Sequence, residues 1–293
     1  MNIDEHVPLS RFTTLGTGGP ARWFAKPTTV DELQRVLAFA AETGAGPATV
    51  VGLGSNLLAA DDGVDRLVVK LAGELAGIEV DGDSVIAGGG APNAVVLHRA
   101  RAAGLGGFEF ACAIPGTTGG GVWMNAGAYG GEFAAVVERA LVVTVAGSEW
   151  LTPAQLGMAY RRSQVGPGRV VARVELRLVP TPAAEIKQIV AELQVRRKSA
   201  QPTNRRTFGS VFKNPEHELT AGRMLEACGL KGLRIGGAQI SPKHANFIEN
   251  ADGARSEDEL ALMVEARRRA FEQFGVDLRH EVELLGLPEL PPL

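Results

Sequence analysis

The sequence has few of the residues that hold metals or build disulfide frameworks. Its two cysteines, Cys112 and Cys228, lie far apart and show no CxxC spacing, so neither a disulfide framework nor a zinc site is indicated. The five histidines do not fall at metal-ligand spacing either. We therefore expect no bound metal and no cysteine chemistry.

Long apolar runs and a strong excess of one charge are also absent. No stretch reaches the roughly 18 apolar residues of a membrane span, and the acidic opening MNIDEHVPLS has no apolar targeting core. The net charge of -3 argues against a surface for nucleic acid or anionic lipid. We expect a cytoplasmic protein with no membrane insertion and no nucleic-acid partner, and no protein partner is indicated.

Two signatures are missing as well. No G-x-G-x-x-G opens a helix, as a dinucleotide-binding Rossmann unit requires, and strand-like and helix-like segments do not alternate strictly. A chain of 293 residues suggests two domains. The sequence therefore favours an α+β fold in two parts.

The third missing signature concerns Ser210, in the segment TFGSVFKNP. A nucleophilic serine usually lies in G-x-S-x-G and depends on a histidine base, but Ser210 is followed by Val211 and Phe212. Two interpretations remain open from the residues alone. The serine either caps a turn or donates a proton to a reacting group.

Glycine, in contrast, is abundant. The sequence has 37 glycines, about 13% of the chain against about 7% in a typical protein, and many of them cluster between segments that resemble regular structure. In GLGSNLL, the residues Gly52, Gly54, Ser55 and Asn56 follow an expected strand. Converging backbone N–H groups there would suit a pyrophosphate, although a simple tight turn is equally consistent with this segment alone.

A second glycine-rich segment runs over residues 113–132, AIPGTTGGGVWMNAGAYGGE. It carries little bulk, so its backbone could lie flat against a large planar ligand such as a flavin or a dinucleotide. The alternative is a glycine-rich loop that packs on a strand.

Local signals predict several elements. Thr29 and Glu32 form a capping box for a helix that ends near Gly44, and Ser256 and Glu259 form a second one for a helix that ends before Gly275. GIEVDGDSVIAGG predicts a β-hairpin, and a helix is expected from Thr181 as N-cap with Pro182 at its first position.

Two further segments carry charged candidates. AYRRS places Arg161 beside Arg162, and in an extended segment one of these side chains would enter a site while the other faces solvent. In HEVELLG, Glu281 and Glu283 share one face of an expected strand.

Seven motifs in the same order resemble the UDP-N-acetylenolpyruvoylglucosamine reductase family over nearly the whole chain. They are FTTLGTGGPA, GLGSNLL, IPGTTGGGVWMNAGAYGGE, YRRS, GSVFKNP, GLKGLRIGGAQISPKHANFIEN and HEVELLG. The resemblance implies a flavin domain of the vanillyl-alcohol-oxidase type at residues 1–180 and a smaller α+β substrate domain at residues 181–293. It also implies tightly bound, non-covalent FAD, with NADPH and a UDP-sugar as substrates.

The resemblance also assigns roles to residues. Gly52, Gly54, Ser55 and Asn56 would bind the FAD pyrophosphate, and Gly116, Thr117, Gly120, Asn125 and Gly127 would line the flavin and its linker. The catalytic residues would be Arg161, Ser210 as proton donor, and Glu281. Lys213, Asn214, Lys231, His244 and Asn246 would contact the substrate.

Some residues depart from the family pattern. Phe208 stands where alanine is common, AIPGTT replaces GIPGTV, and the segment between Arg161 and Ser210 is too short for the extra subdomain of the longer branch. The chain therefore resembles the shorter branch, and the element that closes its pocket is left open. The alternatives are an FAD-dependent oxidase of the same flavin fold and a non-enzymatic nucleotide-binding module.

Overall fold

The computed structural model describes residues 2–293, which form two compact units. The first unit contains residues 2–5, Trp23–Leu53 and Arg66–Arg196, and the second contains His6–Arg22, Gly54–Asp65 and Arg197–Leu293. The second unit thus combines two segments from near the N-terminus with the whole C-terminal part. The functional boundary at residue 180 stays a prediction. The mixture of helices and strands confirms the predicted α+β class.

The N-terminal part of the chain contains a four-stranded sheet and one helix. Residues 6–8, 20–22 and 64–65 of the strands are counted with the second unit, and the rest with the first. The sheet has the order β1 (Ile3–Pro8), β2 (Pro20–Ala25), β5 (Val64–Val69), β3 (Thr49–Val50). Helix α1 (Val30–Glu42) begins as predicted, because the Oγ1 atom of Thr29 accepts a hydrogen bond from the Glu32 N–H at 3.2 Å. The Glu32 carboxylate binds the N–H and hydroxyl of Thr28. The apolar face of α1 lies in a core shared with Leu67 and Val69.

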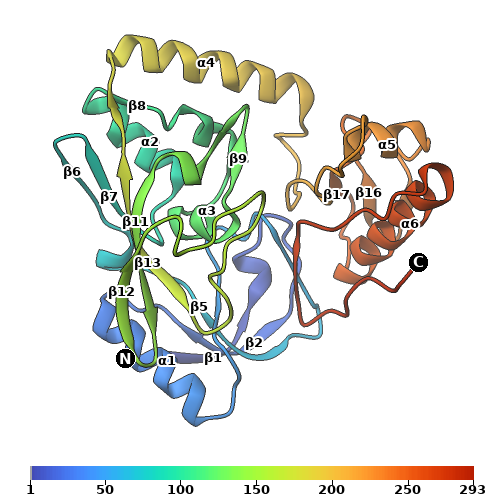
Figure 1. The fold of residues 1–293 in the computed structure, drawn as a ribbon. Coiled ribbons are helices and arrows are strands. Elements are labelled where there is room, and N and C mark those ends of the chain that lie inside the picture. Colours follow the sequence, from blue (N-terminus) through green and yellow to red (C-terminus); the bar gives the residue numbers. More distant parts are fainter. Residues whose placement is uncertain (1) are drawn as a thin grey trace. The chain divides into compact units, whose positions relative to one another are not determined.

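The first unit also contains a five-stranded antiparallel sheet (Figure 1). Its order is β12 (Gly147–Leu151), β11 (Val137–Thr144), β13 (Val170–Arg177), β7 (Ser84–Gly88), β6 (Ile78–Asp81). The predicted hairpin is confirmed, since β6 and β7 pair with Asp81 opposite Ser84. The helices α2 (Asn93–Ala102) and α3 (Thr118–Met124) pack beside this sheet.

Helix α3 accounts for part of the second glycine-rich segment. A Cβ at Gly121 would lie 2.1 Å from the ring of Phe133, and one at Gly119 would lie 2.8 Å from the carbonyl oxygen of Gly89. These two glycines therefore serve internal packing, which is the alternative considered for the segment. Gly120, between them, is exposed on the outer side of the helix.

Short elements connect the remaining parts of the first unit. They are the pair β8 (Leu105–Gly106) with β14 (Val179–Pro180) and the hairpin β9 (Gly127–Ala128) with β10 (Gly131–Glu132). Helix α4 (Ala183–Ala200) begins one residue later than predicted, and the Thr181 hydroxyl donates to the carbonyl of Val179 instead of capping the helix.

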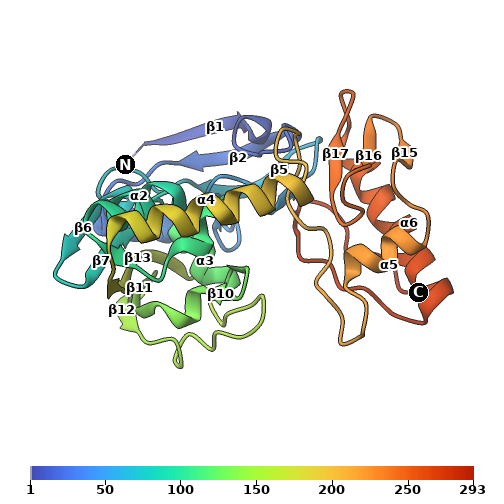
Figure 2. The ribbon, with the colours of Figure 1, turned by 90° about the horizontal axis from the view of Figure 1, so that it is seen from above.

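The second unit contains a small sheet covered by helices. The sheet has the order β15 (Arg234–Ile235), β16 (Ala238–Ile240), β17 (Ile248–Asn250), and α6 (Ser256–Phe274) packs against all three strands (Figure 2). Helix α5 (Ala221–Ala227) lies against α6, and β4 (Leu57–Ala59) pairs in parallel with β18 (Glu283–Leu285). Buried side chains of these elements form one core.

The capping box predicted from Ser256 and Glu259 is wrong by one residue. The N-cap is Arg255, whose N–H donates to the Asp258 carboxylate at 3.0 Å. Ser256 instead binds two distant groups, since its N–H donates to the Asp61 carboxylate and its hydroxyl to the carbonyl of Ala59. Glu259 is fully buried.

Within residues 2–293, no helix combines the length and the apolar composition that crossing a bilayer requires.

Candidate functional site

The first predicted cofactor segment begins where β3 ends. In the first unit, Gly52 lies so close to Thr117 that a Cβ atom on Gly52 would be 2.6 Å from the Thr117 hydroxyl oxygen. The carbonyl of Gly52 accepts a hydrogen bond from the ammonium group of Lys70 at 2.6 Å. The turn and the start of α3 therefore form one continuous surface in which only a glycine fits at position 52.

The start of α3 is arranged around Thr117. Its side chain is the N-cap of the helix and accepts a bond from the Gly120 N–H at 3.5 Å. Gly116 precedes it with a φ of 150°, and its carbonyl accepts from the Asn93 N–H. The segment thus presents backbone and one hydroxyl with no bulky side chain, which fits a planar flavin.

Asn125 ends α3 in a left-handed conformation with a φ of 41° and is fully buried. Its side-chain amide donates to the carbonyl of Ala159 at 3.1 Å, and its carbonyl oxygen accepts from the Ala134 N–H at 2.8 Å. Asn125 therefore joins the glycine-rich segment to the turn that carries Arg161. A direct flavin contact by this side chain stays a prediction.

Arg161 lies against the end of the same segment. Its guanidinium donates to the carbonyl of Gly127 at 2.6 Å and stacks on the Tyr160 ring at 5.0 Å. Arg161 is half-buried and Arg162 is exposed. The segment is a turn and not extended, because Arg161 has a φ of 53° and Ala159 pairs with Arg162.

The rest of the first cofactor segment belongs to the second unit. Gly54 has a φ of 63°, and a Cβ there would lie 2.1 Å from the carbonyl oxygen of Phe12, so the position requires glycine. The side-chain amide of Asn56 donates to the carbonyl of Glu281 at 3.0 Å. The carbonyl of Asn56 accepts from the Glu283 N–H at 3.0 Å. This part of the cofactor segment is thereby fastened to the segment of Glu281.

Ser210 lies beside Glu281 in the same unit. The Glu281 N–H donates to the carbonyl of Val211 at 2.8 Å, and the Lys213 N–H donates to the carbonyl of Arg279 at 2.9 Å. These bonds place residues 211–213 and 279–281 side by side, with Phe212 and His280 paired as in an antiparallel sheet. Gly209, with a φ of 83°, itself lies close to Ser55, since a Cβ on this glycine would lie 3.2 Å from the Ser55 carbonyl oxygen.

Asn246 holds the serine segment from the other side. It is buried, and its side chain accepts from the Phe212 N–H at 2.9 Å and donates to the Phe212 carbonyl at 2.8 Å. The Asn246 carbonyl also accepts from the Val211 N–H. Because both polar atoms of its side chain are engaged, this arrangement favours a supporting role over the predicted direct contact with substrate.

The other predicted substrate residues gather around α5. The Asn214 side chain accepts from the N–H of Ala221, the first residue of that helix, and the ring of His244 packs against Gly222. Lys231, which follows α5 in the chain, forms an ion pair with Glu226 of that helix. Burial, and then the charge of Lys231, lowers the pKa of His244 below its usual value. His244 is therefore a neutral group near pH 7.

Sequence reasoning missed Lys70. It directly follows strand β5, whose last three residues are buried, and its half-buried side chain donates to the Gly52 carbonyl in the predicted pyrophosphate turn. The available signal was a lysine at the end of the apolar run of DRLVVKL.

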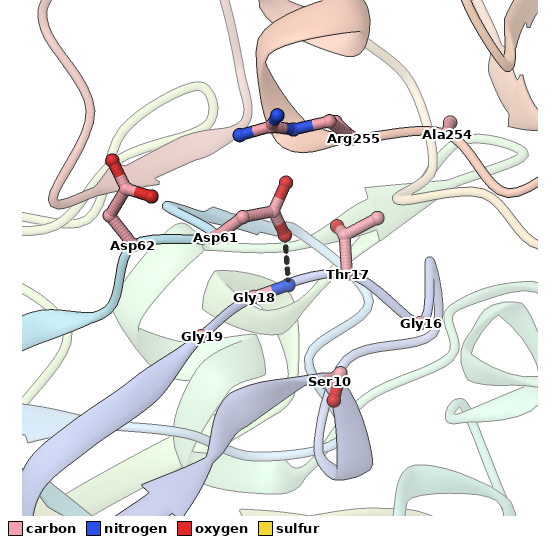
Figure 3. Close-up of a pocket in the computed structure, with 9 residues that line it drawn as sticks. All are labelled: Ser10, Gly16, Thr17, Gly18, Gly19, Asp61, Asp62, Ala254 and Arg255. Carbon is pink, nitrogen blue, oxygen red and sulfur yellow. Dashed lines mark hydrogen bonds between the residues drawn. The ribbon is translucent and has the colours of Figure 1, made fainter.

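A cavity of about 350 Å³ lies elsewhere in the second unit and contains none of the predicted site residues. Asp61 lies between the turn at residues 16–19 and Arg255 (Figure 3). Its two carboxylate oxygens accept from the Gly18 N–H at 3.0 Å and the Ser256 N–H at 2.6 Å. Asp61 therefore joins the turn to the start of α6, which is a structural role.

Comparisons with known proteins agree with the two parts of the site. Residues 21–152 match a family model described as an FAD binding domain, and residues 201–285 match the C-terminal domain of UDP-N-acetylenolpyruvoylglucosamine reductase. The glycine positions with no room for a side chain fit FAD at the first of these regions.

Full-length relatives extend this match. The reductase of Anaeromyxobacter dehalogenans is 46% identical over 98% of this chain and 87% of its own length. Reductase 2 of Symbiobacterium thermophilum is 45% identical over 99% of this chain and 94% of its own. The crystal structure of the Thermus caldophilus reductase superposes with a TM-score of 0.85 at 39% identity and covers 97% of this chain and 99% of that one. The protein described here belongs to the UDP-N-acetylenolpyruvoylglucosamine reductase family.

Proposed function

We propose that the protein reduces the enolpyruvyl group of UDP-N-acetylenolpyruvoylglucosamine with electrons from NADPH and forms UDP-N-acetylmuramate, a precursor of peptidoglycan. The observation that carries the proposal is the pairing of the Ser210 and Glu281 segments in a chain of this family. FAD, when bound, supplies the transfer of hydride from NADPH to C3 of the enolpyruvyl group.

The reaction leaves negative charge at C2, delocalised into the neighbouring carboxylate. We assign its stabilisation to the guanidinium of Arg161, because a fixed positive charge next to a developing enolate lowers the barrier. The bond between Arg161 and the Gly127 carbonyl supports this role, since it holds the guanidinium in one orientation.

Ser210 then donates its hydroxyl proton to C2 and is reprotonated from solvent. A serine hydroxyl is a weak acid, but the enolate carbon is a strong base, so the transfer is favourable without a histidine. Glu281 assists as a hydrogen-bonding partner, either protonated or through a water molecule. Lys213, Asn214, Lys231 and His244 are proposed to contact the UDP-sugar, with Asn246 as support.

The test is NADPH consumption by the purified protein with and without UDP-N-acetylenolpyruvoylglucosamine, alongside Ser210→Ala. We expect oxidation that requires the sugar, and a turnover lowered by about 10²- to 10⁴-fold in the variant while NADPH still bleaches the flavin normally. Oxidation that ignores the sugar and follows oxygen would instead identify an oxidase. We place the activity in the cytoplasm, where nucleotide-sugars and NADPH are available.

A further inference from the structure

Lys70 holds an unusual position for a lysine. It is the residue after β5, whose last three residues are buried, and its own side chain is half-buried. Its ammonium group donates to the carbonyl of Gly52 at 2.6 Å. Placing an ammonium group among apolar residues costs free energy unless the group forms hydrogen bonds or pairs with an opposite charge.

The bond to Gly52 sets the orientation of one peptide group. In a trans peptide the C=O and the following N–H point in opposite directions. Because the ammonium group holds the Gly52 carbonyl, the Leu53 N–H points to the other side of the turn. Within residues 2–293, no backbone carbonyl or side chain accepts a hydrogen bond from this N–H. It is a donor placed in the predicted pyrophosphate turn.

The turn has little freedom to change this orientation. Gly52 is packed against the hydroxyl of Thr117, so the peptide is confined between Thr117 and Lys70. A second cation, Lys26, lies near enough to Lys70 to influence its ionisation. The turn therefore carries the charge of Lys70 at its Gly52 carbonyl, with a second cation near that lysine, an environment that favours an anion.

We propose that Lys70 is a positioning residue for the FAD pyrophosphate, which orients the Leu53 N–H toward the cofactor and adds positive charge behind the turn. This inference rests on FAD binding as part of the proposed function. Lys70 lies outside the glycine-rich motifs and acts on the cofactor turn through its hydrogen bond to the Gly52 carbonyl.

The ionisation of Lys70 gives the inference a pH signature. Burial first, and the charge of Lys26 second, lowers the pKa of Lys70 below the usual lysine value. Rising pH therefore removes the charge of Lys70 before that of an ordinary lysine. A bound pyrophosphate favours the charged form, so FAD affinity should decrease as this proton is lost.

The experiment measures the dissociation constant of FAD directly. FAD is removed from the purified protein, and the apoprotein is titrated with FAD while the flavin fluorescence is followed. The variants are Lys70→Met, which keeps the length of the side chain but removes the charge, and Lys70→Arg, which keeps the charge at high pH. Lys187→Met, at an exposed position of α4, is the matched control.

We expect Lys70→Met to raise the dissociation constant by about tenfold or more, from the loss of one charge-assisted hydrogen bond. Lys70→Arg should recover most of the affinity, and Lys187→Met should match the wild type. Between pH 7 and pH 10.5, wild-type affinity should fall toward that of Lys70→Met, while Lys70→Arg should hold its affinity better.

Equal affinity of Lys70→Met and the wild type would refute the inference. If Lys70→Met does not fold, the comparison of wild type with Lys70→Arg across pH decides, and parallel profiles for those two would also refute it. The readout needs neither NADPH nor the sugar. A protein that binds FAD normally but does not oxidise NADPH would therefore contradict the proposed function and not this inference.

Discussion

The buried carboxyl group of Glu259 should make the stability of the protein depend on pH. Glu259 lies in the first turn of α6 with no exposed surface, and neither of its oxygens has a hydrogen-bond partner among residues 2–293. Burial, and then the charges of Asp258 and Asp61, raises its pKa from 4.5 to about 8. The carboxyl group is therefore protonated in the folded protein at neutral pH, whereas in the unfolded chain it is ionised.

The sign and size of the effect follow from this difference. The folded pKa is raised, so the contribution to stability is fully present below pH 4.5 and is lost as the pH rises to about 8. A shift of 3.5 units, the difference between 8 and 4.5, corresponds to about 5 kcal/mol at about 1.4 kcal/mol per unit. Above pH 8 the loss is complete.

The perturbation is Glu259→Gln, which keeps the shape of the side chain and removes the titration. Urea unfolding followed by circular dichroism gives the free energy of unfolding from pH 5 to pH 9. The wild type should lose stability relative to the variant by about 1.4 kcal/mol per pH unit between pH 5 and pH 8, and the difference should level off above pH 8. Glu257→Gln, an exposed neighbour on the same turn, should follow the wild type. Parallel curves for the wild type and Glu259→Gln would show that the carboxyl group does not titrate as the structure indicates.

Three further substitutions test the site and its support. Gly52→Ala should weaken FAD binding at least tenfold, because the new methyl group would lie 2.6 Å from the Thr117 hydroxyl oxygen, and a flavin titration measures this. Asn246→Ala should lower the free energy of unfolding by about 2–3 kcal/mol, because it leaves the N–H and carbonyl of Phe212 buried without partners, and an undiminished urea midpoint would contradict the reasoning. Gly130→Ala should cost about 1–2 kcal/mol from its φ of 88° alone, since nothing lies within 4 Å of the added atom, and FAD affinity should not change.

The elements that depend on local signals were predictable from the sequence. The helix after Thr29 and the hairpin at Asp81 form where capping and turn residues place them. The start of α6 was misplaced because Ser256 binds Ala59 and Asp61, which are about two hundred positions away in the chain. A local pattern holds no information about such distant partners.

The candidate site was predictable as a set of motifs, but only partly as roles for individual residues. Glycines that admit no side chain, such as Gly52 and Gly54, follow from the pattern. Asn246 resembled a substrate contact because its amide could bind a nucleotide, yet both of its polar atoms bind Phe212. Lys70 was missed because its role depends on a carbonyl 18 positions away that only the fold brings to it.

The composition of the second unit has a consequence for how the protein is made. Residues 6–22 and 54–65 leave the ribosome early, but the strand that pairs with β4 is β18, at Glu283–Leu285, near the end of the chain. Parallel pairing between strands so far apart in sequence forms slowly. β4 therefore has no β18 to pair with until synthesis of the chain is almost complete. The first unit, whose last residue is Arg196, can complete its sheets during that time. A fragment that begins at residue 197 would lack β4, so the C-terminal part should not be an independent folding unit, and late truncations should leave an exposed strand edge that promotes aggregation.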